Sequence, residues 1–264
     1  MENFENNITV NENENTELFK NRKLILIISV ITAAVALILI TALIVLSAIK
    51  YRANIEQIND YVKYHTVEGR EISSRILAFE PVYADTGLIF YPGGLVESEA
   101  YIPLMSALAN EGILCVLIDM PLELAVLDVN AADGVMEEFP HITEWYIGGH
   151  SLGGSMAASY LADNEEAFRG LILLASYTTD DISDTGVDVL SLYGSLDGVL
   201  DMERYEKYKA NLPSDYTEYV IEGGNHAYFG MYGEQSGDGE AVILPETQID
   251  VTADRILRFV VLSN

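Results

Sequence analysis

The sequence predicts an α/β domain with a doubly wound, mostly parallel sheet, preceded by one transmembrane helix. Two observations carry this prediction. From residue 66 to the end of the 264-residue chain, short apolar runs alternate with longer amphipathic stretches, as strands alternate with helices in α/β proteins. Residues 24–49, by contrast, form an uninterrupted run of 26 residues without a charge. Such a run is long enough, as a helix, to cross a bilayer.

The apolar run 24–49 is interpreted as an uncleaved membrane anchor. As a helix rising about 1.5 Å per residue it reaches about 39 Å. Cleavable signal peptides have apolar cores of roughly 7 to 15 residues and an Ala-x-Ala-like site, which this run lacks. Cleavage after Ser47 or Ala48 is the alternative. Basic residues flank both ends, but "KNRK" abuts the run and the preceding head is short. We therefore expect a single-pass cell-membrane protein with a cytoplasmic N-terminus and an extracytoplasmic domain.

The rest of the chain divides into three further segments. Residues 1–23 are rich in Asn and Glu and are expected to form a disordered tail. Residues 50–65 place Ile55, Ile58 and Val62 at helical spacing, which predicts a stalk or packing helix. Residues 66–264 form the α/β domain.

Within this domain the apolar runs predict the strands and the amphipathic stretches predict the helices. The run 113–120, "ILCVLIDM", is continuously apolar and rich in β-formers, as expected of a strand buried on both faces. In such sheets, ligands bind beyond the carboxyl ends of the strands. Strands are predicted at 75–82, 86–91, 113–120, 144–149, 169–177, 188–194 and 216–223, and helices at 98–112, 124–139, 152–167, 202–212 and 248–261.

The charge of the chain excludes one class of partner. Residues 50–264 hold 11 Lys and Arg against 36 Asp and Glu, a net charge of −25. A nucleic-acid partner is therefore not expected. The acidity is interpreted as a solvated, self-repelling surface, with a cationic substrate as the alternative. The single cysteine, Cys115, lies in an apolar strand and is expected to be a buried thiol.

The stretch Gly149-His150-Ser151-Leu152-Gly153 carries the first chemical signal. It follows a predicted strand and opens a predicted helix, which is the context of a G-x-S-x-G nucleophile elbow. Glycines are needed because a side chain at position 149 or 153 would collide with a neighbouring strand or helix. The alternative is a glycine-rich turn with a capping serine.

A serine nucleophile requires a base and an orienting acid, and both follow in the chain. Asp197 lies just past the carboxyl end of the strand 188–194, and Asp201 is the alternative, better explained as an acid at a helix N-terminus. His226 follows a late strand in a glycine-rich loop; a surface-loop histidine is the alternative. The chain order Ser151, Asp197, His226 is typical of α/β hydrolases.

Acyl transfer also requires hydrogen-bond donors for the oxyanion. The amide of Leu152, directly after the serine, is one candidate. The second is expected from "YPGGL" after an early strand, with Gly94 chosen because it has no side chain and Leu95 as the alternative. No metal site is predicted, since Asp238 and Glu240 do not have the spacing of an EF-hand.

Five stretches together resemble the alpha/beta-hydrolase superfamily, in particular its small bacterial fold-5 group related to dienelactone hydrolases. They are "LIFYPGG", "PLELAVLDVNAAD", "YIGGHSLGGSMAA", "LSLYGSLDGVL" and "GGNHAYFGMYGEQSGDG", and the resemblance covers about residues 85–262. It implies an alpha/beta-hydrolase fold, an acyl-enzyme at Ser151 with His226 as base and Asp197 as its orienter, and no cofactor. The chain has Pro92-Gly93 where the family commonly has His-Gly, which changes a pocket wall.

The function predicted from the sequence is a membrane-anchored serine hydrolase that cleaves carboxylic esters or lactones of small substrates. Only about ten residues separate the strand ending near Tyr177 from the one starting near Asp188, so no sizeable cap is expected and the site should be open. An amidase, thioesterase or acyltransferase with the same triad is the alternative, as is a noncatalytic binding domain. The expected partners are the small ester or lactone and the lipid bilayer, through residues 24–49.

Overall fold

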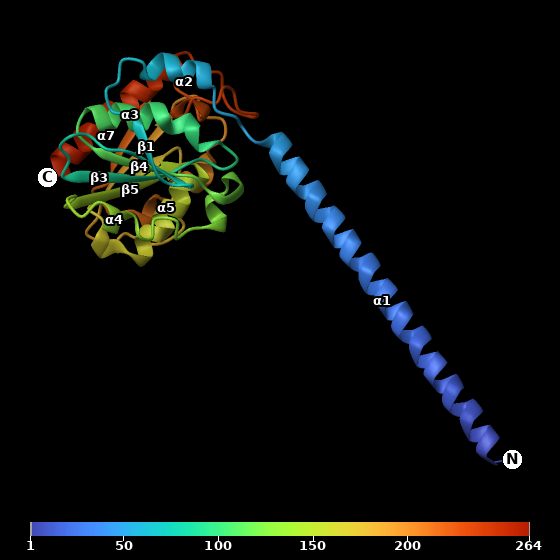
Figure 1. Ribbon diagram of the computed structural model, residues 1–264. Coiled ribbons are helices and arrows are strands. Elements are labelled where there is room, and N and C mark those ends of the chain that lie inside the picture. Colours follow the sequence, from blue (N-terminus) through green and yellow to red (C-terminus); the bar gives the residue numbers. More distant parts are fainter. Residues whose placement is uncertain (1, 264) are drawn as a thin grey trace. The chain divides into compact units, whose positions relative to one another are not determined.

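The computed structural model describes residues 2–263, with side chains described at residues 22, 23 and 25–261. The chain divides into two units, Met1–Ile49 and Lys50–Asn264. The first unit is helix α1 (Glu2–Ile49) and the second is the α/β domain (Figure 1). Residues 2–23 are thus helical where disorder was expected. Extending an existing helix adds a hydrogen bond for each residue without the cost of a new nucleus.

Within α1, Ile25–Ile49 is apolar and long enough to cross a membrane, with a mean hydropathy of 2.9. The hydroxyls of Thr32 and Thr41 donate to the carbonyls of Ile28 and Leu37, one turn earlier. These polar side chains are therefore satisfied within the helix, as an apolar environment requires. A membrane anchor and a signal sequence share this length and composition.

The domain is built on an eight-stranded sheet in the order β1-β2-β4-β3-β5-β6-β7-β8. The pairs β1–β2 and β2–β4 are antiparallel and the other pairs are parallel, which confirms the predicted mostly parallel sheet. The strand β1 was not predicted, because most of its residues are polar and exposed. The strands are β1 (Gly69–Ser73), β2 (Ile76–Phe79), β3 (Thr86–Tyr91), β4 (Leu114–Ile118), β5 (Glu144–His150), β6 (Gly170–Leu174), β7 (Asp188–Gly194) and β8 (Thr217–Ile221).

Helices cover both faces of the sheet, as the doubly wound prediction requires. In Figure 1, α2, α3 and α7 lie on one face, and α4 and α5 lie on the other. Each face has its own apolar core. Helix α2, the predicted stalk or packing helix, buries Ile58 in the first core. The helices are α2 (Ile55–Val62), α3 (Ile102–Asn110), α4 (Val135–Glu138), α5 (Leu152–Asp163), α6 (Met202–Tyr208) and α7 (Pro245–Ser263).

The helix predicted over 124–139 is wrong for most of its length. Only the 3-10 turn Ala125–Leu127 and the short α4 are helical there. The segment between them contains Asp and Asn, which favour turns, and Gly134 has a φ of 78°, outside the right-handed helical region. Amphipathic spacing alone therefore overstated the helix.

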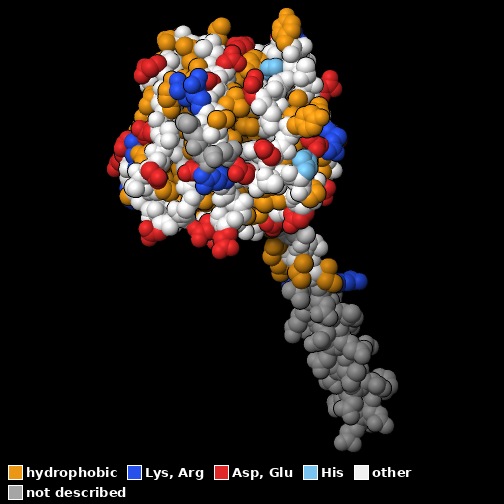
Figure 2. All heavy atoms as spheres, turned by 90° about the vertical axis from the view of Figure 1, so that its left-hand side faces the viewer, with side chains coloured by type: hydrophobic (Ala, Val, Ile, Leu, Met, Phe, Trp, Pro, Cys, Tyr) orange, Lys and Arg blue, Asp and Glu red, His pale blue; other side chains and the backbone are white. Residues whose placement is uncertain are grey.

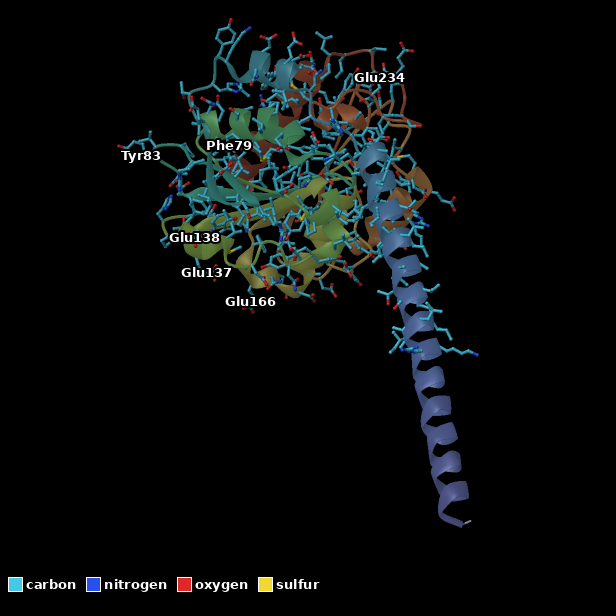
Figure 3. All side chains as sticks on the ribbon, turned by 45° about the vertical axis from the view of Figure 1, so that its right-hand side comes forward. Phe79, Tyr83, Glu137, Glu138, Glu166 and Glu234 are labelled. Carbon is cyan, nitrogen blue, oxygen red and sulfur yellow. The ribbon has the colours of Figure 1, made fainter. Side chains whose placement is uncertain are left out.

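The parallel strands β3 to β8 all end at one edge of the sheet, called here the carboxyl edge, and begin at the opposite amino edge. Tyr83 precedes β3 and Glu234 follows β8, and they lie at opposite ends of the domain (Figure 3). Between β6 and β7, residues 175–187 contain no helix, so no helical cap is inserted there. Acidic side chains are spread over the face of the domain seen in Figure 2.

Candidate active site

Ser151 occupies a sharp turn between β5 and α5 at the carboxyl edge. Its φ of 52° and ψ of −122° are rare for a residue other than glycine. A Cβ on Gly149 would lie 2.5 Å from the Tyr91 carbonyl oxygen, and one on Gly153 would lie 2.1 Å from the Pro92 carbonyl oxygen. The expectation that side chains at both positions would collide with their neighbours is confirmed. The turn is therefore packed directly against the end of β3.

Asp197 and His226 form a buried pair. Each side chain is 1% exposed, and Nδ1 of His226 lies 2.9 Å from Oδ2 of Asp197. The other carboxylate oxygen accepts hydrogen bonds from the amides of Val199 (2.9 Å) and Leu200 (2.8 Å). The carboxylate thus fixes the histidine with its proton on Nδ1. Nε2 is buried and has no hydrogen-bond partner among the described residues, so its lone pair can receive a proton.

The His226 ring lies beside the residue that precedes the serine. Its centroid is 4.6 Å from that of the His150 ring. The hydroxyl of Ser176 donates to the Ser151 carbonyl over 2.7 Å and holds the turn from the β6 side. The buried pair of Asp197 and His226 therefore lies beside the turn that carries Ser151.

The loop after β3 lies beside the first turn of α5. A Cβ on Gly94 would lie 3.1 Å from Cδ2 of Leu152, so the two expected oxyanion donors belong to adjacent segments. The amide of Leu95, the alternative donor, already donates to the Glu123 carbonyl over 2.7 Å. This bond favours Gly94 as the donor from this loop.

Sequence reasoning missed a buried pair behind the site, Tyr101 and His150. The Gly93 amide donates to the Tyr101 hydroxyl (3.0 Å), which lies 2.8 Å from Nδ1 of His150. Burial raises the pKa of the Tyr101 phenol. Burial, and then the neighbouring His226, hold the pKa of His150 well below 6.5. A neutral phenol that donates to Nδ1 of a neutral imidazole links the loop after β3 to the turn that carries Ser151, whereas Nε2 of His150 is buried without a hydrogen-bond partner among the described residues. Tyr101 had no sequence signal, whereas His150 stood inside the motif.

Asp238 was considered only as a metal ligand, but it organises the loops of the site. Its carboxylate accepts four amide hydrogen bonds: from Gly198 (3.0 Å), His226 (3.2 Å), Ala227 (2.8 Å) and Gly239 (2.8 Å). Gly198 follows Asp197, so one side chain ties the acid loop to the histidine loop. The available signal was the "GDG" that ends the last family-like stretch.

Asp201 and Cys115 were also considered from the sequence. Asp201 is the N-cap of α6 and accepts a hydrogen bond from the Arg204 amide (3.1 Å), which confirms its interpretation as a helix N-terminal acid. In the part of the chain that the structure describes, no group of three or more His, Cys, Asp or Glu side chains is placed to hold a metal ion. Cys115 is buried, as expected, and burial raises the pKa of its thiol.

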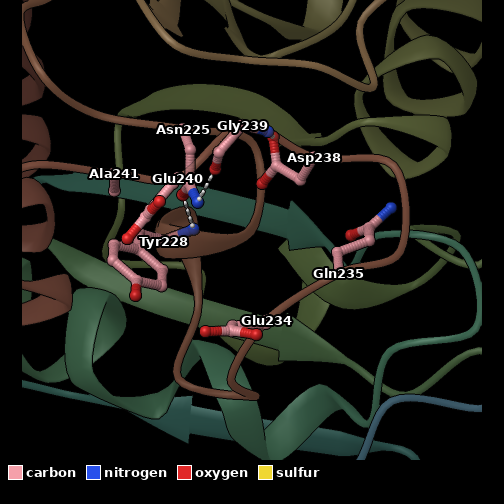
Figure 4. Close-up of a pocket in the computed structure, with 8 residues that line it drawn as sticks. All are labelled: Asn225, Tyr228, Glu234, Gln235, Asp238, Gly239, Glu240 and Ala241. Carbon is pink, nitrogen blue, oxygen red and sulfur yellow. Dashed lines mark hydrogen bonds between the residues drawn. The ribbon is translucent and has the colours of Figure 1, made fainter.

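A polar cavity of about 260 Å³ lies in the loops around His226 (Figure 4). Within its wall, the Asn225 side chain donates to the Gly239 carbonyl (2.9 Å) and accepts from the Tyr228 amide (3.0 Å). Three carboxylates give the cavity its acidic character. The lining residues are Asn225, Tyr228, Glu234, Gln235, Asp238, Gly239, Glu240 and Ala241.

A comparison of the sequence with protein families indicates the same kind of fold. The model of the alpha/beta hydrolase family matches residues 87–250, more than half of the chain. The chain therefore belongs to the alpha/beta hydrolase family. Among curated proteins, none matches the sequence.

Solved structures of hydrolases share the fold at low sequence identity. The carboxylesterase CesB of Bacillus subtilis is 14% identical, with a TM-score of 0.56 over 78% of this chain and 96% of its own. The dienelactone hydrolase of Anabaena variabilis is 14% identical, with a TM-score of 0.53 over 74% and 97%. Est1E of Butyrivibrio proteoclasticus is 15% identical, with a TM-score of 0.52 over 74% and 99%.

Proposed function

We propose that the chain is a membrane-anchored serine hydrolase that cleaves carboxylic esters or lactones of small substrates. The observation that carries this proposal is the state of His226. Its Nδ1 is held by the buried Asp197, and its ring lies next to the turn that carries Ser151, with Nε2 buried and without a hydrogen-bond partner among the described residues. A histidine oriented in this way is suited to act as a general base toward a neighbouring hydroxyl.

In the proposed reaction the Ser151 hydroxyl attacks the ester carbonyl carbon while Nε2 of His226 takes its proton. The amides of Leu152 and Gly94 stabilise the negative charge on the carbonyl oxygen. The tetrahedral intermediate collapses to an acyl-enzyme, and His226 returns the proton to the departing alcohol. Water, deprotonated by His226, then attacks the acyl carbon and releases the acid and free Ser151. Asp197 stabilises the imidazolium formed in each half of the cycle.

The choice of esters and lactones is supported by the kind of site and by the neighbours. Without a helical cap, the site is open to small or flexible acyl groups. Esterases and a dienelactone hydrolase share the fold, and Est1E has a structure with ferulic acid bound. We assign the chain to the fold-5, dienelactone-hydrolase-like group on the stretches that surround Ser151, Asp197 and His226.

The proposal includes the anchor. Residues 24–49 hold the protein in the cell membrane, with the N-terminus cytoplasmic and the domain extracytoplasmic. The length and composition of Ile25–Ile49 support this assignment. Protease added to intact cells is expected to degrade the domain; degradation only after lysis would reverse the orientation.

The deciding experiment is labelling with a fluorophosphonate probe combined with a substrate panel. Wild type is expected to be labelled at Ser151 and to hydrolyse short-chain esters, and Ser151→Ala is expected to lose both. Ser159→Ala is the matched control, because Ser159 lies two turns further along α5 and its hydroxyl donates to the Asp180 carboxylate. Folded wild type without labelling would overturn the proposal, and turnover of amides or thioesters but not esters would change the reaction assigned.

A further inference from the structure

The chain enters the α/β domain at the carboxyl edge, beside the loop that carries Gly94. The Tyr51 amide donates to the Leu95 carbonyl over 2.7 Å, and the Glu97 amide donates to the Tyr51 carbonyl over 3.0 Å. Tyr51 and Val96 thus form a parallel bridge. The first residues after the apolar helix are therefore hydrogen-bonded to the loop that carries Gly94.

Residues 50–54, called here the entry segment, are bonded to several loops of the carboxyl edge. Nζ of Lys50 lies 3.0 Å from a carboxylate oxygen of Glu97 and 3.0 Å from one of Glu123. Hydrogen bonds to Glu123 and Glu97 raise the pKa of Lys50, so it remains charged. The Asn54 amide donates to the Met231 carbonyl over 2.8 Å, in the loop that follows His226. The entry segment is therefore not a loose tether.

Apolar side chains are exposed on the neighbouring loop. Leu122, Val126 and Leu127 follow β4 and are 46%, 54% and 55% exposed. This loop is hydrogen-bonded to Leu95, because the Leu95 amide donates to the Glu123 carbonyl. Leu95 in turn accepts the hydrogen bond from the Tyr51 amide. Three exposed apolar side chains, called here the apolar rim, therefore lie close to where the chain arrives from the apolar helix.

Covalent connectivity limits the distance between this rim and the membrane. Two residues of extended chain reach about 7 Å, so Tyr51 lies within that distance of Ile49, where the apolar helix ends. If residues 24–49 span the bilayer, the loops bonded to Tyr51 lie at its surface. The net charge of −25 on residues 50–264 opposes contact with anionic lipid and leaves an uncharged surface as the compatible one.

We propose that the carboxyl edge faces the bilayer and that the site takes its acyl esters from the surface of an uncharged membrane, with the apolar rim in contact with lipid. This inference rests on the proposed function and extends its substrates from small soluble esters to amphiphilic esters whose hydrocarbon part stays in the bilayer. It also explains how a site without a cap can bind such esters. The bilayer, rather than a cap, holds the apolar part of the substrate while the carbonyl reaches Ser151.

The test uses the full chain in phosphatidylcholine vesicles and two esters of one fluorophore, a soluble butyrate and a vesicle-borne oleate. The measured quantity is the ratio of kcat/KM for the oleate to kcat/KM for the butyrate. Combining Leu122→Ser, Val126→Ser and Leu127→Ser is expected to lower this ratio by about tenfold or more, because contact with lipid depends on buried apolar area. The matched control combines Val82→Ser and Tyr83→Ser at the amino edge. Val82 and Tyr83 are 89% and 88% exposed, and their replacement is expected to change the ratio by less than about twofold.

A second variant changes no side chain of the domain. A flexible Gly/Ser linker of about 20 residues inserted between Ile49 and Lys50 adds roughly 25 Å of reach and should also lower the ratio. An unchanged ratio in the insertion variant or in a folded rim variant overturns the inference, as does an equal fall in the amino-edge control. If the rim variant is not folded, the insertion variant decides alone. If wild type is not labelled at Ser151 and hydrolyses neither ester, the proposed function itself fails.

Discussion

The carboxyl edge and the amino edge of the sheet differ in how much strained backbone they contain. In the part of the chain that the structure describes, five residues other than glycine have a positive φ: Leu95, Leu122, Glu123, Ser151 and Ala175. All five follow the carboxyl ends of parallel strands. At the amino edge the positive φ directly before β4 belongs to Gly112, which adopts it without strain. Strained backbone is thus concentrated where the candidate active site lies, as expected when rigid geometry serves a site rather than stability.

The largest expected difference between the edges concerns two aspartates at opposite ends of β7. Asp197→Asn should lower kcat by about 10⁴-fold, because an amide no longer orients and stabilises a His226 imidazolium. Asp188→Asn, at the amino edge, weakens a half-buried ion pair with Arg169 at the opposite end of β7 from the candidate active site, and should leave kcat unchanged. Steady-state kinetics on a short ester checks both variants. Comparable losses would show that the sensitivity is not confined to the carboxyl edge.

Glycines provide the next test. Gly153→Ala would place a Cβ 2.1 Å from the Pro92 carbonyl oxygen and is expected to cost about 3 kcal/mol of the free energy of unfolding, with loss of activity. Gly186 precedes β7 at the amino edge, and a Cβ there would have no atom within 4 Å. Gly186→Ala should therefore be neutral in urea unfolding and in ester hydrolysis. A stable, active Gly153→Ala protein would contradict the packing described for the turn.

The sequence was sufficient for the parts of the molecule that local patterns determine. The apolar runs predicted every parallel strand, and the glycine spacing predicted the turn at Ser151. The polar strand β1 was missed because it has no apolar pattern, and the helix over 124–139 was overstated because its turn-forming residues were outweighed by spacing. Both failures come from weak local signals.

Contacts between distant segments were beyond the reach of the sequence. Tyr101 acquires its role only because α3 brings it to Gly93 and His150. Asp238 acquires its role only because its loop folds back onto Gly198 and His226. In the same way, the choice between Gly94 and Leu95 depended on a hydrogen bond from Leu95 to Glu123. A single sequence shows residue types but not these pairings.

A smaller effect on stability is expected at Ser151 and Gly112, two positions with a positive φ. Ser151→Gly should raise the free energy of unfolding by about 1–2 kcal/mol relative to Ser151→Ala, since glycine accepts a φ of 52° without penalty. Gly112→Ala should have the opposite effect, a loss of about 1 kcal/mol at a φ of 99°, without loss of activity. Urea unfolding of the three variants measures these differences. Equal stability of the two Ser151 variants would mean that the turn is not strained.

The smallest expected effect is the pH dependence that His150 contributes to stability. Its pKa in the folded protein lies well below the ordinary 6.5, because the ring is buried and next to His226. Below about pH 6.5 the unfolded chain therefore binds a proton that the folded protein does not, and the free energy of unfolding falls as the pH falls. Between pH 7 and pH 6 this amounts to about 0.7 kcal/mol. His150→Gln should reduce the fall seen in wild type by that amount in urea unfolding at the two pH values. An unchanged pH dependence would show that His150 is not held neutral behind the site. The strained turn at the carboxyl edge would then not be packed on a buried, uncharged His150 ring.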